Sequence, residues 1–306
     1  MSKKALFILF FALLALIVPV FAQETETVEM VTVIDDLDRE VVIPNPVTSI
    51  VSLAPSLTET IYFLDGMDLL SGVDMYSDYP AEAADIDKVT NWDLTINYEA
   101  LVAAEPEIVF AAEINSMEQV KEMEDLGLTV YYVKNPTTFE ELYATVLRVG
   151  EVLGKDAEAE ALVDEMEEHV AAVEAVMADN TEVPLVFYEL DATDPTKPWT
   201  AGKGTFISMI ITMAGGRNLG DDAEGAWVQL GQEALMAADP DVILLGDYLY
   251  GNTPETVAAR TGWDGIKAVA DGAMYGFDDN LVSRPGPRLV EGLEVIAEIL
   301  HPELFK

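Results

Sequence analysis

The pattern of hydrophobic and polar positions divides the chain into short strands, short helices and one long helix. Residues 30–44 read MVTVIDDLDREVVIP, where two apolar runs flank an aspartate-rich turn, so we predict a β-hairpin. Further along, short apolar runs at residues 50–53, 107–111 and 127–133 alternate with stretches of helical composition. This alternation predicts parallel strands covered by helices.

The first predicted helix follows the strand at residues 50–53. Ser56 and Glu59 have the spacing of a capping box, in which a hydroxyl and a carboxylate accept hydrogen bonds from the free N–H groups of a first helical turn. The helical pattern continues to about Leu64, where we expect the helix to end.

Residues 138–178 have a longer helical pattern. Thr138 is a suitable N-cap. After Gly154, the segment DAEAEALVDEMEEHVAAVEAVMA carries an apolar stripe at helical spacing that includes Leu162 and Val170. At a rise of 1.5 Å per residue, its roughly 23 residues would span about 34 Å, which is long enough to bridge two lobes.

The alternation of strands and helices resumes after residue 180, with predicted strands at 185–188, 241–245 and 273–277 and a helix at 206–214. We therefore predict an α/β protein with two Rossmann-like lobes, joined by one long rigid α-helix. The predicted divisions are a signal peptide at 1–22, an N-terminal lobe at 23–140, connecting helices at 141–179 and a C-terminal lobe at 180–306.

One phrase occurs twice in the chain. Residues 97–110 read NYEALVAAEPEIVF, and residues 231–244 read GQEALMAADPDVIL. Each copy predicts a short helix that is capped by Asn97 or Gly231, ends before a proline and leads into a strand. Similar packing in two similar lobes accounts for the shared alanines, leucine and proline. It accounts only in part for Glu99 and Glu233, because a carboxylate in a first helical turn gains only about 0.3–1 kcal/mol from the helix dipole.

The first 22 residues have the composition of a secretory signal peptide. Lys3 and Lys4 precede an uncharged apolar run from Ala5 to Val18, and Ala22 suits cleavage by the small-residue rule. An uncleaved N-terminal anchor is the alternative. The chain has no cysteine, so it lacks the residue that carries the lipid of a bacterial lipoprotein. We therefore predict a periplasmic monomer without direct membrane insertion after cleavage.

Charge and side-chain chemistry exclude several classes of function. The chain of 306 residues has a formal net charge of −40, which repels nucleic-acid backbones and anionic lipid surfaces. The segment AGKGT at 201–205 lacks the glycine spacing and the final hydroxyl residue of a phosphate-binding loop. The two histidines, His169 and His301, are far apart in the sequence, so we predict no metal site. With no nucleophile motif either, we predict that the protein is not an enzyme and has no cofactor.

Four motifs resemble one known family, in the same order along the chain. They are IVSLAPSLTETIYFL at 50–64, SGVDMYSDYP at 71–80, the phrase at 97–110, and SRPGPRLVEGL at 283–293. From about residue 48 to the end, the chain resembles the periplasmic iron-siderophore/cobalamin-binding proteins. These are the class III substrate-binding proteins of ABC importers, and the cobalamin-binding branch is the most similar. The resemblance implies a small transported ligand, held in a ligand cleft between the two lobes, and an ABC permease, with its ATPase, as the partner.

The resemblance also assigns roles to residues. It implies that Glu99 and Glu233 are docking posts, one on each lobe, for arginines of the permease. The residues that it places against a corrinoid, a cobalamin-like ring, are aromatic or lie in one loop near the C-terminus. They are Tyr76, Trp92, Trp199, Trp227, Asn280 and Arg284, with Trp199 standing where the family has a phenylalanine.

The identity of the ligand is left open by the sequence. Residues 280–282 depart from the family pattern in the loop that contacts the corrin ring. Haem is one alternative, with Tyr76 or Tyr79 as the axial phenolate. A ferric siderophore is another, although few lysines and arginines are available for such an anion. Arg284 can bind the ligand or tie down the helix that starts near Pro287. Beyond this family, a ligand sensor or a cleft enzyme is the alternative.

Overall fold

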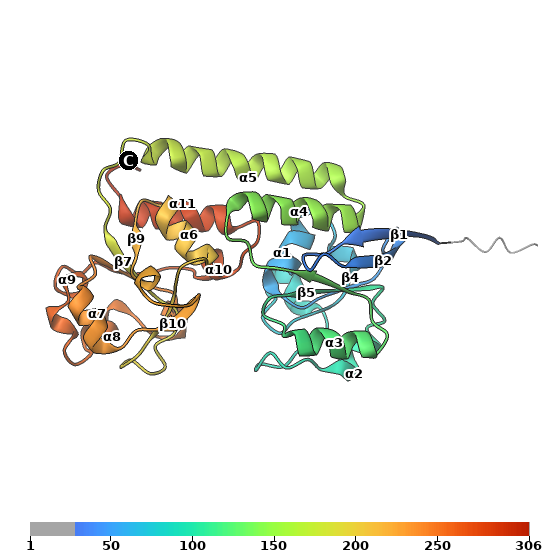
Figure 1. Cartoon of the computed structure of the whole chain (residues 1–306), viewed down its shortest axis with the longest axis horizontal. Helices are drawn as coiled ribbons and strands as arrows, with labels where there is room; N and C mark the ends of the chain where they lie inside the picture. Colours follow the sequence, from blue (N-terminus) through green and yellow to red (C-terminus); the bar gives the residue numbers. More distant parts are fainter. Residues whose placement is uncertain (1–27, 306) are drawn as a thin grey trace, which may run out of the picture.

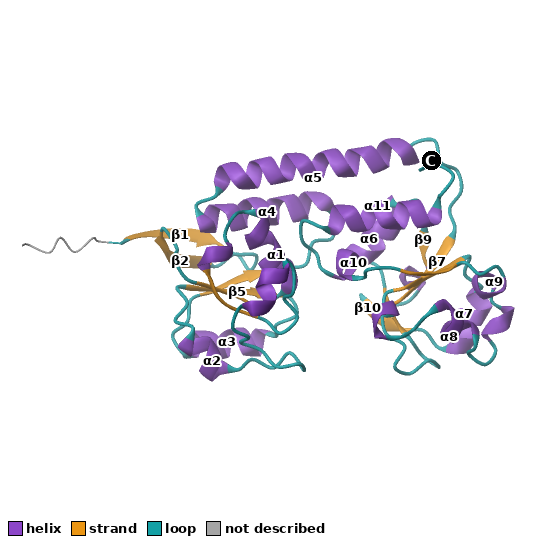
Figure 2. Ribbon diagram, turned by 180° about the vertical axis from the view of Figure 1, so that it is seen from behind, coloured by secondary structure: helices purple, strands orange, loops and turns teal. Residues whose placement is uncertain are grey.

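The computed structural model describes residues 28–305, and these form two α/β lobes that lie side by side beneath a long helix (Figures 1 and 2). The predicted signal peptide at 1–22 lies outside the described residues. The predicted fold class is confirmed: each lobe contains a four-stranded parallel sheet, and one helix runs across both lobes.

The N-terminal lobe is built on the sheet β4-β3-β5-β6, in which all neighbouring strands are parallel. Its core strands are fully buried, as their near-continuous apolar sequences require. The predicted hairpin is present as the antiparallel pair β1–β2. The elements are β1 Glu29–Ile34, β2 Glu40–Asn45, β3 Ile50–Ser52, α1 Pro55–Phe63, η1 Met67–Leu69, β4 Leu70–Val73, η2 Ala81–Asp85, α2 Tyr98–Ala103, β5 Ile108–Ala112, α3 Met117–Asp125 and β6 Val130–Val133.

The C-terminal lobe repeats this design with the parallel sheet β12-β11-β7-β9. A separate antiparallel pair, β8–β10, is also present. The elements are β7 Leu185–Glu189, β8 Trp199–Ala201, α6 Phe206–Met213, β9 Arg217–Asn218, η3 Leu219–Asp222, β10 Trp227–Gln229, α7 Gln232–Ala238, β11 Val242–Leu245, η4 Tyr248–Tyr250, α8 Pro254–Ala258, η5 Trp263–Gly265, α9 Lys267–Ala270, β12 Met274–Gly276, α10 Asn280–Ser283 and α11 Leu289–Leu300.

Two helices connect the lobes. The predicted N-cap of α4 (Phe139–Leu153) is confirmed, because the Thr138 hydroxyl accepts a hydrogen bond from the Glu141 N–H. Gly154 then turns the chain in the left-handed region, at φ 66°, which glycine adopts without strain. α5 (Asp156–Met177) packs its predicted apolar stripe onto α4 of the N-terminal lobe and α11 of the C-terminal lobe. One straight element is thereby anchored on both lobes (Figure 2).

The predicted capping box at the start of α1 is wrong. Ala54, not Ser56, is the N-cap, and it has no side-chain hydrogen bond. The carboxylate of Glu59 does not reach back to the first turn, because two arginines of the other lobe bind it in the interior. Three hydrogen bonds between ionised groups outweigh the single bond that a capping carboxylate would accept from a backbone N–H, so the long-range contact determines the orientation of Glu59.

The repeated phrase forms the same unit in each lobe, α2–β5 and α7–β11. The predicted caps are confirmed: Asn97 accepts a hydrogen bond from the backbone of the first turn of α2, and Gly231 is the N-cap of α7. Both helices end before the proline. The residues that precede the two prolines, Glu105 and Asp239, share a positive φ of 47° and 50°. The repetition therefore extends to the backbone conformation.

Candidate functional site

Two adjoining cavities lie between the lobes, at the carboxyl ends of the strands in both sheets. Open α/β sheets bind their ligands at this edge, where the loops that follow the strands converge. We call the first the apolar pocket; it measures about 550 Å³ and is lined by Leu53, Tyr76, Ile114, Leu190, Ile207 and Tyr250, among others. We call the second the polar pocket; it measures about 690 Å³ and is lined by Asp36, Lys134, Thr137, Glu141, Arg148 and Thr205, among others.

Each lobe contributes one wall of the apolar pocket. The N-terminal lobe supplies the residues that follow β3, β4 and β5, which include Leu53, Tyr76 and Ile114. The C-terminal lobe supplies Leu190 after β7 and Tyr250 in η4. Aliphatic and aromatic side chains from both lobes therefore face the same space, as expected for a cleft that takes a large and mostly apolar ligand.

Two of the four predicted aromatic residues line the apolar pocket. Tyr76 does so, and its hydroxyl donates a hydrogen bond to the backbone oxygen of Trp92 at 2.5 Å. Trp227 lines both pockets, and its ring meets Phe206 edge to face at 6.0 Å. These aromatic contacts hold the two rings in defined positions at the cleft wall.

The other two predicted tryptophans line neither pocket. Trp92 is 70 % exposed and packs edge to face on Tyr76, so it supports that ring from outside. Trp199 lies in β8 opposite Gln229 of β10 and is 39 % exposed. Tyr250, which the sequence analysis did not single out, is 83 % exposed and lines the apolar pocket.

Asn280 and Arg284 line the apolar pocket, as the resemblance implies, but the guanidinium of Arg284 is already bound by protein groups. It donates hydrogen bonds to Glu59 at 3.0 Å, to Asp78 at 2.8 Å and to the backbone oxygen of Tyr76 at 3.2 Å. Burial lowers the pKa of Arg284, but its hydrogen bonds to the two carboxylates outweigh this and hold the pKa above its usual value. Arg284 is therefore a fixed cation that also positions the loop of Tyr76.

Glu59, Arg284 and Arg288 form what we call the lobe-junction cluster. Glu59, from α1 of the N-terminal lobe, has a side chain that is only 1 % exposed. Arg288, at the start of α11, donates to both of its oxygens, at 2.9 and 2.6 Å. The cluster therefore joins the two lobes through one buried carboxylate beside the apolar pocket.

Tyr79 belongs to this junction and not to either pocket. The guanidinium of Arg288 lies 3.8 Å from the centre of the Tyr79 ring, and the ring also packs on Tyr62 and Phe63. Burial raises the pKa of the Tyr79 phenol above its ordinary value. Of the two candidate phenolates, only Tyr76 lies in the wall of the cleft.

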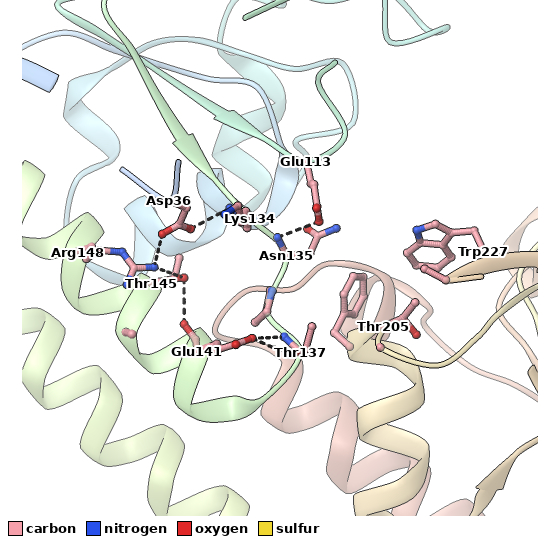
Figure 3. A pocket seen from close by; sticks show the side chains of 15 residues that line it. Asp36, Glu113, Lys134, Asn135, Thr137, Glu141, Thr145, Arg148, Thr205 and Trp227 are labelled. Atoms are coloured by element: carbon pink, nitrogen blue, oxygen red, sulfur yellow. Dashed lines mark hydrogen bonds and ion pairs between the residues drawn. The ribbon is translucent and has the colours of Figure 1, made fainter. Parts of the chain in front are cut away.

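Paired charges line the polar pocket (Figure 3). Asp36, in the turn of the β1–β2 hairpin, forms an ion pair with Arg148 of α4 at 2.7 Å and accepts a hydrogen bond from the backbone N–H of Lys134 at 2.9 Å. Glu141 accepts hydrogen bonds from the backbone and hydroxyl of Thr137, which lower its pKa. The ammonium group of Lys134 forms no ion pair within residues 28–305.

Buried acids lie behind the C-terminal wall of the cleft. Burial raises the pKa of Asp279 to about 6, and the Tyr188 hydroxyl donates to its carboxylate. Burial and the charge of Glu189 raise the pKa of Asp247 to about 7. Glu189 is itself bound by Arg260. No group of three or more acids, histidines or cysteines within residues 28–305 is arranged to hold a metal ion.

The two repeated glutamates lie outside the cleft. Glu99 and Glu233 are exposed in the first turns of α2 and α7. Figure 1 shows these helices in different lobes, both on the side of the molecule away from α5. The structure thus presents one carboxylate from each lobe at matching positions. Within the described chain, no helix is both long and apolar enough to cross a membrane.

Comparisons with known proteins identify the family. The family model of the periplasmic binding proteins matches residues 50–281. The chain is 35 % identical over 289 residues to the uncharacterized ABC transporter substrate-binding lipoprotein YvrC of Bacillus subtilis, covering 93 % of this chain and 89 % of that protein. That relative is named a lipoprotein, whereas this chain contains no cysteine.

Two further proteins have names that include a ligand. The chain is 29 % identical over 259 residues to a cobalamin-binding protein of Halobacterium salinarum, covering 82 % of this chain and 69 % of that protein. The solved structure of the periplasmic heme-binding protein RhuT of Roseiflexus sp. RS-1 has the same fold. Its TM-score is 0.74 at 23 % identity, with 84 % of this chain and 99 % of that chain covered.

The resemblance drawn from the four sequence motifs is thus confirmed. Members of this family bind small molecules and pass them to the permease of an ABC transporter, and they do not catalyse a reaction on them. The chain belongs to the periplasmic binding protein family of ABC-importer substrate-binding proteins, and is not an enzyme.

Proposed function

We propose that this protein binds a cobalamin-like corrinoid between its lobes and delivers it to an ABC permease in the periplasm. The observation that carries the proposal is the apolar pocket, in which aliphatic groups and the rings of Tyr76, Trp227 and Tyr250 surround one space. A corrinoid is a wide, mostly neutral ring with an edge of amides, so it requires flat apolar contact and a few polar groups. Asn280 and Ser283 supply such polar groups in the same wall.

The charges at the cleft support a neutral ring over a ferric siderophore. A highly anionic chelate needs several cations that are free to bind it. Of the three basic residues that line the two pockets, Arg284 is bound to two carboxylates and Arg148 to one. Only Lys134 remains without an ion pair among the described residues, which is too little positive charge for such a ligand.

Haem is the second candidate, because a haem-binding protein shares this fold. An axial ligand would have to come from the cleft. None of the described residues that line the two pockets is a histidine or a methionine. The Tyr76 phenol is engaged by the Trp92 backbone, and Tyr250 is the other phenol in the wall. The cobalamin-binding name of the halobacterial relative adds support for a corrinoid.

Delivery would use Glu99 and Glu233 as docking posts on the permease. Both carboxylates are exposed, and neither α2 nor α7 covers the cleft. Each glutamate side chain lies in a first helical turn and is exposed to solvent, so a basic partner surface can form an ion pair with both carboxylates at once. The formal net charge of −40 would steer the protein toward such a surface.

Quenching of tryptophan fluorescence tests the corrinoid assignment. Corrinoids absorb where tryptophan emits, so cobalamin bound beside Trp227 should quench the emission in a saturable manner at micromolar or lower concentrations. Trp263 is 1 % exposed in the interior of the C-terminal lobe, so it contributes an emission that depends less on contact with the ligand.

Two matched variants identify the site of quenching. Trp227→Phe should lose a larger share of the ligand-dependent signal than Trp199→Phe, which alters a tryptophan outside both pockets, because energy transfer to the corrinoid falls steeply with distance. Haemin serves as the comparison ligand. Saturable binding of haemin with no response to cobalamin would refute the corrinoid proposal and make Tyr76 or Tyr250 the axial candidate, to be checked by the Soret band.

A further inference from the structure

We infer that the polar pocket is a second ligand subsite, which receives the nucleotide loop that hangs from a complete corrinoid. The inference rests on the proposed function, since it names the part of the ligand that the second cavity takes. In this arrangement the ring occupies the apolar pocket, and the phosphodiester and ribose of the loop occupy the polar pocket.

The two pockets adjoin one another. Four residues line both of them: Glu113, Asn135, Phe206 and Trp227. Figure 3 shows Glu113 and Asn135 on one side of the polar pocket and Trp227 on the other. A single molecule can therefore extend past the edge of the Trp227 ring and have one part on each side of it.

The topology explains why one half of the cleft is apolar and the other polar. The apolar pocket follows the carboxyl ends of β3, β4 and β5, where the chain continues with residues such as Leu53 and Ile114. The polar pocket follows the end of β6, where residues 134–137 lead into α4. Glu141, Thr145 and Arg148 recur on one face of α4, at the spacing of successive helical turns. The N-terminal wall of the polar pocket is therefore built mainly from one helix, one loop and one hairpin turn, and Thr205, Phe206 and Trp227 of the C-terminal lobe form the wall opposite.

The lining of the polar pocket has a mixed chemistry. Three carboxylates, from Asp36, Glu113 and Glu141, can accept hydrogen bonds, and the ammonium group of Lys134 can pair with an anion. A nucleotide loop matches this mixture, because its ribose hydroxyl is a donor and its phosphodiester is an anion. Carboxylate side chains of a haem are anions alone and would meet three carboxylates of the protein. The mixture therefore favours the nucleotide loop over the propionates of haem.

The size of the polar pocket supports the same choice. Its volume of about 690 Å³ is comparable with the 550 Å³ or so of the apolar pocket, which takes the ring. Ligands of this class of site bury most of their surface, so a cavity of that size calls for a bulky group. One or two propionate groups of a haem would leave most of the polar pocket to water. The base, ribose and phosphate of a nucleotide loop would fill much more of the pocket.

The test compares cobalamin with cobinamide, a corrinoid that lacks the nucleotide loop. The wild-type protein should bind cobalamin at least about tenfold more tightly than cobinamide, as measured by titration calorimetry at fixed ionic strength. Lys134→Ala should weaken cobalamin binding about fivefold and leave cobinamide binding within about twofold, because only cobalamin carries the phosphodiester. The loss for cobalamin should shrink as salt is added.

Lys121→Ala is the matched control, since it removes the same charge from the N-terminal lobe. Lys121 lies on α3, pairs with Asp125 and lines neither pocket, so this variant should bind both ligands like the wild type.

Equal binding of the two corrinoids by the wild-type protein, or equal weakening of both by Lys134→Ala, would overturn the subsite and leave the proposed function intact. Binding of neither corrinoid would overturn the proposed function itself. Haemin binding that depends on Lys134, with no corrinoid binding, would assign the anion to a haem carboxylate.

Discussion

Replacing Glu59 by glutamine removes the negative charge that the two arginines of the lobe-junction cluster share. Three hydrogen bonds of 2.6–3.0 Å join this carboxylate to Arg284 and Arg288. All three side chains are less than 10 % exposed, so water cannot replace the lost charge. Removing one partner of a buried pair costs about 3–5 kcal/mol, because the other charge is left uncompensated. Here two guanidinium groups are left facing one amide, so we expect a loss in that range.

Asp78→Asn provides the matched control. Asp78 contacts the same guanidinium at 2.8 Å, but its side chain is 61 % exposed. Exposed ion pairs contribute about 0–1 kcal/mol, so this variant should lose little stability. The two variants remove the same charge beside Arg284, but only Glu59 is buried and only Glu59 also binds Arg288. The difference between them therefore measures what the buried carboxylate adds through burial and through its two bonds to Arg288.

Urea denaturation followed by two signals is the assay. Trp199, Trp227 and Trp263 belong to the C-terminal lobe, so fluorescence reports mainly on that lobe, while far-UV circular dichroism reports on both. In the wild type the two transitions should coincide. In Glu59→Gln the free energy of unfolding should fall by about 3–5 kcal/mol, and the two transitions should separate because the lobes lose their buried link. A loss below about 1 kcal/mol, or one equal to that of Asp78→Asn, would refute this account of the junction.

Three further predictions concern other parts of the molecule. The double variant Glu99→Ala and Glu233→Ala should keep the wild-type Kd for the ligand but reduce uptake in cells about tenfold or more; unchanged uptake would exclude the docking role. Because burial and a neighbouring carboxylate raise the pKa of Asp247 to about 7, the unfolded chain releases this proton at lower pH than the folded protein. Asp247 should therefore make the free energy of unfolding fall as pH rises from about 4 to about 7. Asp247→Asn removes this titration, so between pH 5 and pH 8 the urea midpoint of the variant should fall less than the urea midpoint of the wild type. Gly220→Ala should lower the free energy of unfolding by about 1–3 kcal/mol, because the added Cβ would overlap a backbone carbonyl oxygen of β8. Gly265→Ala is the control: its Cβ would point into open space, so its free energy of unfolding in urea should stay within about 1 kcal/mol of the wild-type value.

Local signals in the sequence predicted much of the fold. The caps at Asn97 and Thr138 act through hydrogen bonds over three residues, so their positions can be derived from the sequence alone. The end of each helix before its proline and the apolar stripe of α5 also depend on residues that are close in the sequence. These features predicted the two helix–strand units and the long connection, and with them the exposure of Glu99 and Glu233 in equivalent first turns.

The junction and part of the cleft wall depend on contacts that no local pattern carries. Glu59 has the spacing of a cap, but its partners lie more than 200 positions further along the chain. The same applies to Tyr250 and Lys134, which become cleft residues only once two sheets place their strand ends together. Trp199 shows the reverse case: the family resemblance implied a ligand contact, yet Trp199 lies in β8, paired with β10, and lines neither pocket.

The helix α5 has a consequence for how the protein would recognise a membrane partner. Because α5 packs on α4 in one lobe and on α11 in the other, it sets a fixed separation between the two lobes and so between Glu99 and Glu233. Two weak exposed ion pairs held at a fixed separation act as a bivalent ligand, since formation of the first places the second at a high effective concentration. With Glu99 and Glu233 as the proposed docking posts, the helix would act as a spacer that selects receptors by distance. Four residues inserted into α5, about one turn, should abolish this avidity while each single contact remains chemically intact.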